Sequence, residues 1–198
     1  MLCNRCYRKG VFGVYAYAVV GYLDNETENK LKNIWGLLSD KGLTHYGVEI
    51  KGKRPHITIA DYDSLDKEEF IRLFDNYYKD KEKINLSLTI LGTFIDTGTL
   101  FIAPTLSKEL ITFHANHHNN FCEFNMNENS FYLPGRWVPH CTIASRLDEA
   151  KMFEVFRFCQ SALNKISCQI NEVAVIQIKL NERGIAIEDT PIFSKILK

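Results

Sequence analysis

Two stretches decide the fold of this chain: Pro55-His56-Ile57-Thr58-Ile59-Ala60 and Pro139-His140-Cys141-Thr142-Ile143-Ala144. We refer to them as the first and the second tag. They agree at five of six positions, lie in different halves of the chain, and combine β-branched residues with a proline at the start, as edge strands do. Because side chains alternate along a strand, each tag presents its histidine and threonine on one face and its apolar residues on the other. Two such faces opposite each other would form a symmetric site for a phosphate group.

The similarity between the two halves continues beyond the tags. Leu65-Asp66 matches Leu147-Asp148, and Lys83-Ile84 matches Lys165-Ile166, both at one common offset that nearly equals the offset of the tags. Solenoid repeats have periods of up to about 50 residues, so this longer period indicates an internal duplication instead. We therefore predict a single α+β domain over residues 1–198. It is expected to be bilobal, a pseudo-two-fold duplication with repeats at roughly 14–98 and 99–188 and the tags meeting at their junction.

The predicted elements follow the same order in each half. In the first half, caps, turn residues and periodicity predict a strand at 14–23, a helix from Asp24 to Gly42, a strand at 46–50 joined by the hairpin turn 51–53 to the first tag, a helix after Leu65-Asp66, and a strand at 84–95. The second half is predicted to contain a strand at 99–103, a helix near Ser107, the second tag, a helix from Leu147-Asp148, and strands at about 168–180 and 184–188. The tail at 191–197 has no assignment.

The composition is that of an ordinary globular protein with no membrane-spanning run. Of the 198 residues, 45% are hydrophobic and 24% are charged, and the 24 basic residues balance the 24 acidic ones. A long nucleic-acid duplex is disfavoured as a partner, because proteins that bind one usually carry a basic stripe. An RNA end or a small phosphorylated nucleotide is compatible with this balance. Nothing in the sequence predicts a membrane or a protein partner.

The cysteines and the first residues indicate the cellular compartment in which we expect the protein. Cys3-x-x-Cys6 has the spacing of a metal or redox pair, but no second pair follows, so free thiols in a reducing cytoplasm are the favoured interpretation. Arg5, Arg8 and Lys9 precede an apolar stretch and imitate a secretory signal. The stretch is rich in strand formers and leads directly into a helix, which favours a first strand. We expect a cytoplasmic protein.

The paired histidines and threonines suit phosphodiester chemistry. Imidazole titrates near neutrality, so one histidine can accept a proton while a protonated partner donates one. Thr58 and Thr142 can donate hydrogen bonds to the non-bridging phosphate oxygens as charge develops there. This scheme requires no metal or other cofactor, and no carboxylate-rich cluster with metal-binding spacing lies near either tag.

The motifs resemble those of a known superfamily. Residues 17–24 (Tyr-Ala-Val-Val-Gly-Tyr-Leu-Asp), 54–62 and 137–144 are similar to the two-histidine (2H) phosphoesterases, and most closely to their 2'-5' RNA ligase-like, RNA 2',3'-cyclic phosphodiesterase branch. The resemblance covers most of residues 14–188. It implies two antiparallel sheets around a central cleft with the helices outside. It also implies metal-independent action on 2',3'-cyclic phosphates or 2'-5' linkages of RNA or nucleotides, with His56 and His140 catalytic and Thr58 and Thr142 binding phosphate.

Other residues near the tags are secondary candidates for substrate contact. Tyr62 and Trp137 could stack on a base, although packing in the core or rim explains them equally well. Arg54 and Arg136 could attract phosphate, although loop arginines are usually only solvated.

Three histidines, His114, His117 and His118, share one face of a predicted helix. They lack an obvious fourth metal ligand, so we expect a partly exposed helix surface rather than a metal site. His45 has no assigned role.

Three hypotheses follow for the function. The leading one is an enzyme that acts on cyclic phosphate ends or 2'-5' bonds. The alternative is a non-catalytic module that holds an RNA end or a nucleotide in the same cleft; intact paired histidines argue against it, because binding alone needs cations more than titrating groups. A weaker alternative is metal sensing by the histidine-rich helix and Cys3-x-x-Cys6.

Overall fold

The computed structural model describes residues 15–95 and 97–198, so the expectations for Cys3, Cys6 and the basic residues before 10 lie outside the described residues. The strands are β1 (Tyr15–Leu23), β2 (His56–Tyr62), β3 (Ile84–Phe94), β4 (Thr99–Pro104), β5 (Cys141–Ala144), β6 (Ile166–Leu180) and β7 (Ala186–Ile196). The helices are α1 (Asn25–Asp40), the short α2 (Tyr46–Glu49), α3 (Lys67–Tyr78), α4 (Lys108–Asn120) and α5 (Glu149–Ala162), and a 3-10 turn covers Cys122–Phe124. No described helix is long and apolar enough to cross a membrane.

The named strands form one antiparallel sheet in the order β2-β1-β6-β3-β4-β5, with β7 paired to β6. The long strand β6 connects two wings. Its residues 172–179 pair with both β1 and β7, whereas residues 166–170 pair with β3. The two sheets expected from the resemblance are therefore two wings that share β6, and the α+β antiparallel class is confirmed.

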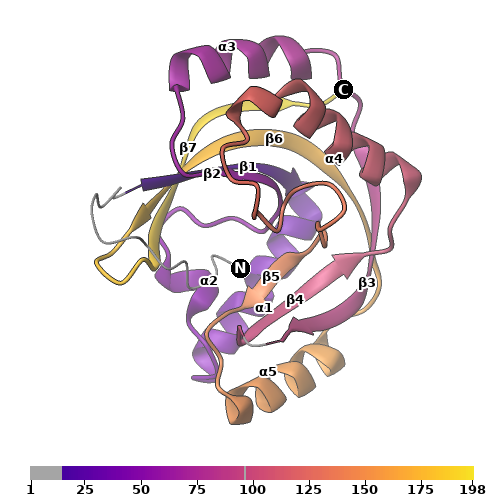
Figure 1. Ribbon diagram of the computed structural model, residues 1–198. Helices are drawn as coiled ribbons and strands as arrows, with labels where there is room; N and C mark the ends of the chain where they lie inside the picture. The colour runs from indigo at the N-terminus through magenta and orange to yellow at the C-terminus, as the bar shows by residue number, and fades with distance from the viewer. Residues whose placement is uncertain (1–14, 96) are drawn as a thin grey trace.

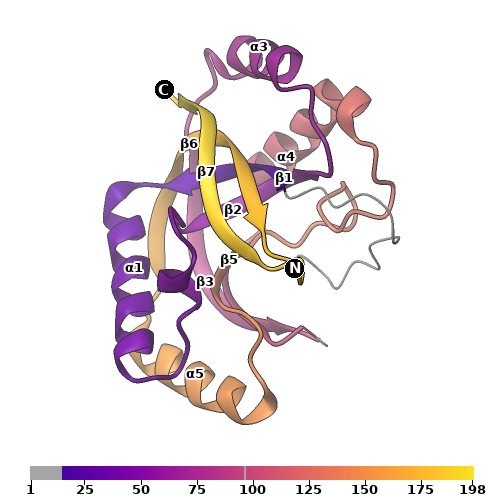
Figure 2. The same cartoon turned by 90° about the vertical axis from the view of Figure 1, so that its left-hand side faces the viewer.

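The strand order reflects the duplication. When β1 is exchanged with β4, β2 with β5 and β3 with β6, the result is the same order of these six strands, read from the other end of the sheet. The helices are related in the same way, α1 to α4 and α3 to α5. Accordingly, α3 and α4 lie side by side on one side of the molecule, and α1 and α5 lie on the opposite side (Figures 1 and 2). Each half therefore contributes one tag strand, β2 or β5, at an end of the strand order.

The tag strands are anchored from behind as their alternation predicts. Ile57, Ile59 and Ile143 are fully buried or nearly so, whereas Thr58 and Thr142 on the other face keep partial exposure. Cys141 takes the place of the first isoleucine in the second tag and is buried as a free thiol. Burial of these apolar side chains contributes about 1.5–3 kcal/mol each and fixes the register, so the histidine–threonine faces are held in place.

The prediction of a strand and hairpin over 46–53 was wrong. Residues 46–49 form helix α2, because Gly47 packs directly on the Trp35 ring, where a β-carbon would come within 2.1 Å of it. Tertiary packing thus overrides strand propensity. The segment 51–53 does not turn back on a strand but lies along β7: Lys51 N–H donates to Ile187 O, and Asp189 N–H donates to Lys51 O.

Candidate active site

The two tags meet at one cleft. His56 and Thr58 of the first tag and His140 and Thr142 of the second line the same cavity, together with Lys53, Tyr132 and Asp189 and residues of β1 and β6. His56 begins β2, and His140 immediately precedes β5. Positions in opposite halves of the sequence are therefore brought together by the pseudo-symmetric fold. The arrangement places two imidazoles and two hydroxyls around one space.

Backbone carbonyls fix the orientation of both imidazoles. His56 Nδ1 lies 2.6 Å from Arg54 O, and His140 Nδ1 lies 2.7 Å from Val138 O, in each case the carbonyl two residues upstream. A carbonyl only accepts, so Nδ1 carries the hydrogen in both rings. In the neutral ring, Nε2 therefore keeps its lone pair. Both histidines have the same tautomer, with Nε2 available for proton transfer.

Burial keeps both histidines neutral in the free protein. It lowers the pKa of His140 to about 4. Burial also lowers the pKa of His56 to about 4, and the nearby Lys53 ammonium adds to this effect, while Asp189 opposes it. An anion in the cleft would raise the pKa of either ring. A bound phosphate is thus the kind of ligand that would bring a proton onto this pair.

Aromatic side chains pack against both rings. The Tyr22 ring meets His56 edge-on at 6.2 Å between centroids, and Phe94 and Phe101 lie 4.8 and 5.2 Å from His140. Phe94 also lines a second, apolar cavity that shares His140 with the first and includes Phe131 and Val138. The sequence reasoning missed this apolar wall, because Phe94 and Phe131 lie outside both tags and carry no motif that marks them.

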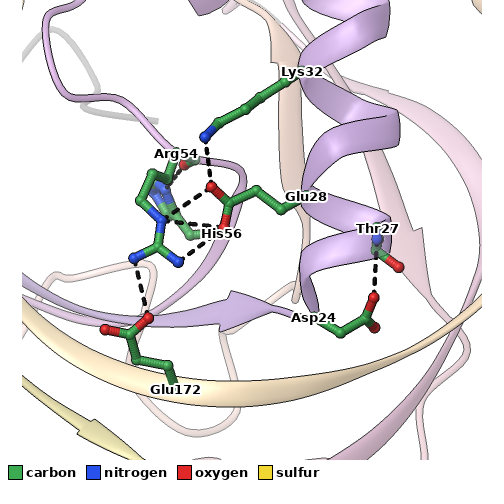
Figure 3. Close-up of polar contacts among 7 residues, drawn as sticks. All are labelled: Asp24, Thr27, Glu28, Lys32, Arg54, His56 and Glu172. Carbon is green, nitrogen blue, oxygen red and sulfur yellow. Dashed lines mark hydrogen bonds and ion pairs between the residues drawn. The ribbon is translucent and has the colours of Figure 1, made fainter.

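Arg54 does not line the cleft. Its guanidinium donates three hydrogen bonds to Glu28, at 2.8–3.1 Å, and one to Glu172, at 3.0 Å (Figure 3). It also stacks on the Tyr22 ring at 3.6 Å. The sequence left Arg54 open between a phosphate contact and a solvated loop residue; in the structure its guanidinium is instead paired with two carboxylates. Its backbone carbonyl is the group that reaches the site, since it orients His56.

Trp137 is also occupied by protein contacts. Its Nε1–H donates to Thr58 O at 2.9 Å, and its ring stacks on His114 at 3.8 Å and 4°. Of the two interpretations left open for Trp137, stacking on a base and packing, these contacts fit packing, and they hold the first tag strand. Trp137 belongs to the loop before the second tag, so this hydrogen bond ties the two tags together.

The other two candidates lie at the cavities. Tyr62 lines the first cavity, but its hydroxyl is 2.9 Å from His117 Nε2 and its ring packs on Phe70. Arg136 is exposed at the second cavity. Among the hydrogen bonds of the described chain, its guanidinium makes one, to the Glu128 carbonyl at 3.3 Å. Of the four secondary candidates, Arg136 has the most freedom to reach a ligand.

The histidine-rich face of α4 is buried, so the expected exposed surface was wrong. His117 lies between the hydroxyls of Tyr62 and Tyr78, and His118 Nε2 donates to Ile59 O at 3.1 Å. His114 donates to Tyr132 O at 2.7 Å. In the described part of the chain, no group of three or more histidine, cysteine, aspartate or glutamate side chains is arranged to hold a metal ion. The cluster packs α4 against the first tag strand.

The comparisons with known proteins identify the family. A family model described as the 2'-5' RNA ligase superfamily matches residues 29–182. The chain therefore belongs to this superfamily of two-histidine phosphoesterases. Membership supports phosphoesterase-type chemistry on RNA. A search of curated protein sequences finds no match.

Solved structures share the fold. LigT of E. coli in its apo form aligns with a TM-score of 0.61 at 14% identity, over 92% of this chain and 97% of LigT. TT0787 of Thermus thermophilus aligns with a TM-score of 0.55 at 13% identity, over 91% of this chain and 97% of TT0787. At these identities the similarity concerns the fold alone.

Proposed function

We propose that this protein is a metal-independent phosphoesterase that acts on 2',3'-cyclic phosphate ends or 2'-5' linkages of RNA or nucleotides. The observation that carries the proposal is the pairing in one cleft of two histidines that share a tautomer, each with a threonine beside it. Crystal structures of LigT with phosphate and with 3'-AMP support the choice of a nucleotide phosphate as ligand.

The chemistry requires the two imidazoles to differ by one proton. A phosphodiester monoanion entering the cleft raises the pKa of the rings beside it, so that one ring takes up a proton and the other stays neutral. The neutral ring accepts a proton through Nε2 from the attacking water or hydroxyl. The protonated ring donates a proton from Nε2 to the leaving oxygen. The net proton count of the pair is unchanged after each turnover.

The threonines stabilise the phosphoryl group. Thr58 and Thr142 share the cleft with the histidines, and hydroxyl donors aimed at non-bridging oxygens stabilise the charge that develops there. The apolar wall of Phe94, Phe131 and Val138 next to His140 suits the ring of a nucleotide, and Arg136 at its rim suits a further phosphate. This geometry favours a nucleotide or an RNA end over an inorganic polyphosphate.

The test is hydrolysis of 2',3'-cyclic nucleotides and 2'-5' dinucleotides in EDTA. Loss of general acid or base catalysis lowers rates by about 10²–10⁴-fold, so His56→Ala and His140→Ala should each lose activity to that extent. The control is His45→Ala, because His45 is exposed and its ring bonds only Ser39 among the described residues. Full activity in either cleft variant would contradict the proposal, and binding of a 2',3'-cyclic nucleotide without any turnover would favour a binding module.

A further inference from the structure

We propose that Trp137 and His118 are positioning residues that hold a β-bulge at Ile59 in the first tag, and that this bulge turns the Thr58 hydroxyl towards the phosphate. The proposal rests on the phosphoesterase function proposed above and concerns how one of the two threonines is held. Neither Trp137 nor His118 lines the cavity between the tags, so both act through the tag strand.

Both tags depart from regular strand pairing at the same place. In β2, Ile59 is an extra residue, because its neighbours Thr58 and Ala60 pair with consecutive residues of β1. In β5, Ile143 is an extra residue in the same way, opposite two consecutive residues of β4. The unpaired residue is thus the isoleucine after the threonine in each tag. A bulge bends its strand and re-aims the neighbouring side chains, and bulges are common next to active sites.

The bulge changes which side chains of β2 face the cleft. Strict alternation from Thr58 would turn Ala60 towards the cleft. Instead, Ile59 and Ala60 are both fully buried, and Asp61 lines the cleft together with Thr58. A shift of one residue exchanges the two faces of a strand. The orientation of Thr58 relative to its neighbours therefore depends on the bulge staying in place.

Two side chains bond the consecutive carbonyls at this bulge. Trp137 Nε1–H donates to Thr58 O at 2.9 Å, and His118 Nε2 donates to Ile59 O at 3.1 Å. Consecutive carbonyls of a regular strand point to opposite edges, so the bulge is what brings these two within reach of neighbouring donors. The strand β2 lies at an end of the strand order, which leaves one of its edges open to such donors.

The two donors belong to one packed group of rings. The His114 ring stacks on the Trp137 ring at 3.8 Å and 4°, and it lies 4.6 Å from the His118 ring. His114 is fixed in turn by its hydrogen bond to Tyr132 O at 2.7 Å. Both histidines are buried, so neither ring can turn out into solvent. Supports of this kind, locked by packing and further hydrogen bonds, hold a site to the accuracy that catalysis needs.

The indole support is specific to the first tag. When the two tags are aligned, Trp137 corresponds to Lys53, whose ammonium pairs with Asp189. The duplication therefore repeats the threonine and the bulge but not the tryptophan that bonds the threonine carbonyl. The influence of Trp137 on catalysis should pass through Thr58 and not through Thr142, which makes the two threonines a matched pair for an experiment.

The experiment is a double-mutant cycle on kcat/KM for a 2',3'-cyclic nucleotide. Trp137→Phe removes the N–H but keeps a ring to stack on His114. Because a misplacement of about 1 Å can cost about 10²-fold in rate, we expect a loss of about 10-fold. In a Thr58→Val background the same change should cost less than about two-fold, and in a Thr142→Val background again about 10-fold, since only coupled residues depart from additivity. The control Trp35→Phe alters a buried indole with no partner in the described structure and should leave kcat/KM unchanged.

His118 provides a second, independent variant. His118→Leu leaves the Ile59 carbonyl without its donor and should also lower kcat/KM, by about 10-fold. His118→Gln keeps an amide donor and should return kcat/KM to within about three-fold of wild type. NMR shifts of the backbone at 58–60 report the bulge in the free protein, whether or not it turns over. They should move in Trp137→Phe and in His118→Leu but not in the control Trp35→Phe.

Two results would overturn the inference. One is a set of unchanged backbone shifts at 58–60 in both Trp137→Phe and His118→Leu, because neither residue would then hold the bulge. The other is a loss of kcat/KM in Trp137→Phe that persists in the Thr58→Val background, because Trp137 would then act through the second tag. If Trp137→Phe fails to fold, the comparison of His118→Leu with His118→Gln decides. Failure of wild type to hydrolyse any substrate would instead count against the proposed function.

Discussion

The substitution Arg54→Lys tests whether Arg54 positions His56 or binds substrate. The guanidinium makes four hydrogen bonds, three to Glu28 and one to Glu172, and its own backbone carbonyl holds His56 Nδ1 at 2.6 Å. A lysine is a point charge and cannot reproduce the two-pronged contact with Glu28. The lysine ammonium should remain paired with at most one of the two carboxylates, Glu28 or Glu172.

The magnitude follows from the burial of the cluster. Glu28 is 9% exposed and Arg54 is 28% exposed at the side chain, so solvent screens part of the interaction. Hydrogen bonds to charged groups contribute about 1.5–3 kcal/mol each, and partial exposure reduces the total here to about 2 kcal/mol of unfolding free energy. A His56 ring that loses its fixed orientation should lower kcat about 10-fold, equivalent to about 1.4 kcal/mol of activation free energy.

The assays are urea unfolding and steady-state kinetics on a 2',3'-cyclic nucleotide. We expect Arg54→Lys to lower the unfolding midpoint and kcat while KM changes less than about two-fold, since a loss confined to kcat marks an interaction with the transition state. The control Arg136→Lys alters an exposed arginine with one carbonyl contact and should leave stability unchanged. A raised KM with unchanged kcat and stability in Arg54→Lys would refute the reasoning and make Arg54 a substrate contact.

Three further predictions concern the supports of the cleft. Trp137→Phe should lower the unfolding free energy by about 1–3 kcal/mol, because it removes the hydrogen bond to the Thr58 carbonyl. The control Trp35→Phe should lower it by less than about 1 kcal/mol, because the buried Trp35 Nε1 has no partner in the described structure. Equal losses in urea unfolding would contradict this. Gly52→Ala should lower the unfolding free energy more than Gly42→Ala, because both glycines have a positive φ but a β-carbon at Gly52 would also come within 2.3 Å of Asp189 O; equal losses in urea unfolding would contradict this. Burial lowers the pKa of His114 to about 4. The unfolding free energy should therefore fall as the pH drops from 6.5 towards 4, by about 1.4 kcal/mol per pH unit for each such buried, neutral histidine. An unfolding free energy that does not change with pH in this range would contradict this.

The sign of this last dependence follows from proton linkage. An unfolded histidine titrates near 6.5, while burial keeps the folded one neutral down to about pH 4. Between these values the unfolded state binds more protons, so acid favours unfolding. The full unfolding free energy is therefore present above pH 6.5 and is lost progressively between pH 6.5 and about 4.

The repeated tags were sufficient to predict the architecture. Alternation in Pro-His-x-Thr-Ile-Ala gave both the buried face and the face towards the cleft, and caps such as Asp66 and Asp148 predicted the starts of α3 and α5 correctly. These features are local, so a single sequence contains them. The pairing of the two distant tags followed from the duplication rather than from any local signal.

The supporting residues could not be predicted, because long-range contacts define their roles. Arg54 beside the first tag has the chemistry of a phosphate ligand, and only the folded positions of Glu28 and Glu172 show that it is already paired. Lys53 was assigned to a hairpin turn, and its place in the cleft depends on β7, at the far end of the chain. The buried face of α4 was missed because its histidines are satisfied by Tyr62, Tyr78 and backbone carbonyls rather than by neighbours in sequence.

The central claim is that the two tags bind one phosphate between them, and a crystal structure with 3'-AMP tests it most directly. We predict that phosphate oxygens lie within hydrogen-bond distance of Nε2 of both His56 and His140 and of the hydroxyls of Thr58 and Thr142. A phosphate bound outside the cleft, or one that contacts only one of the two histidines, would contradict it.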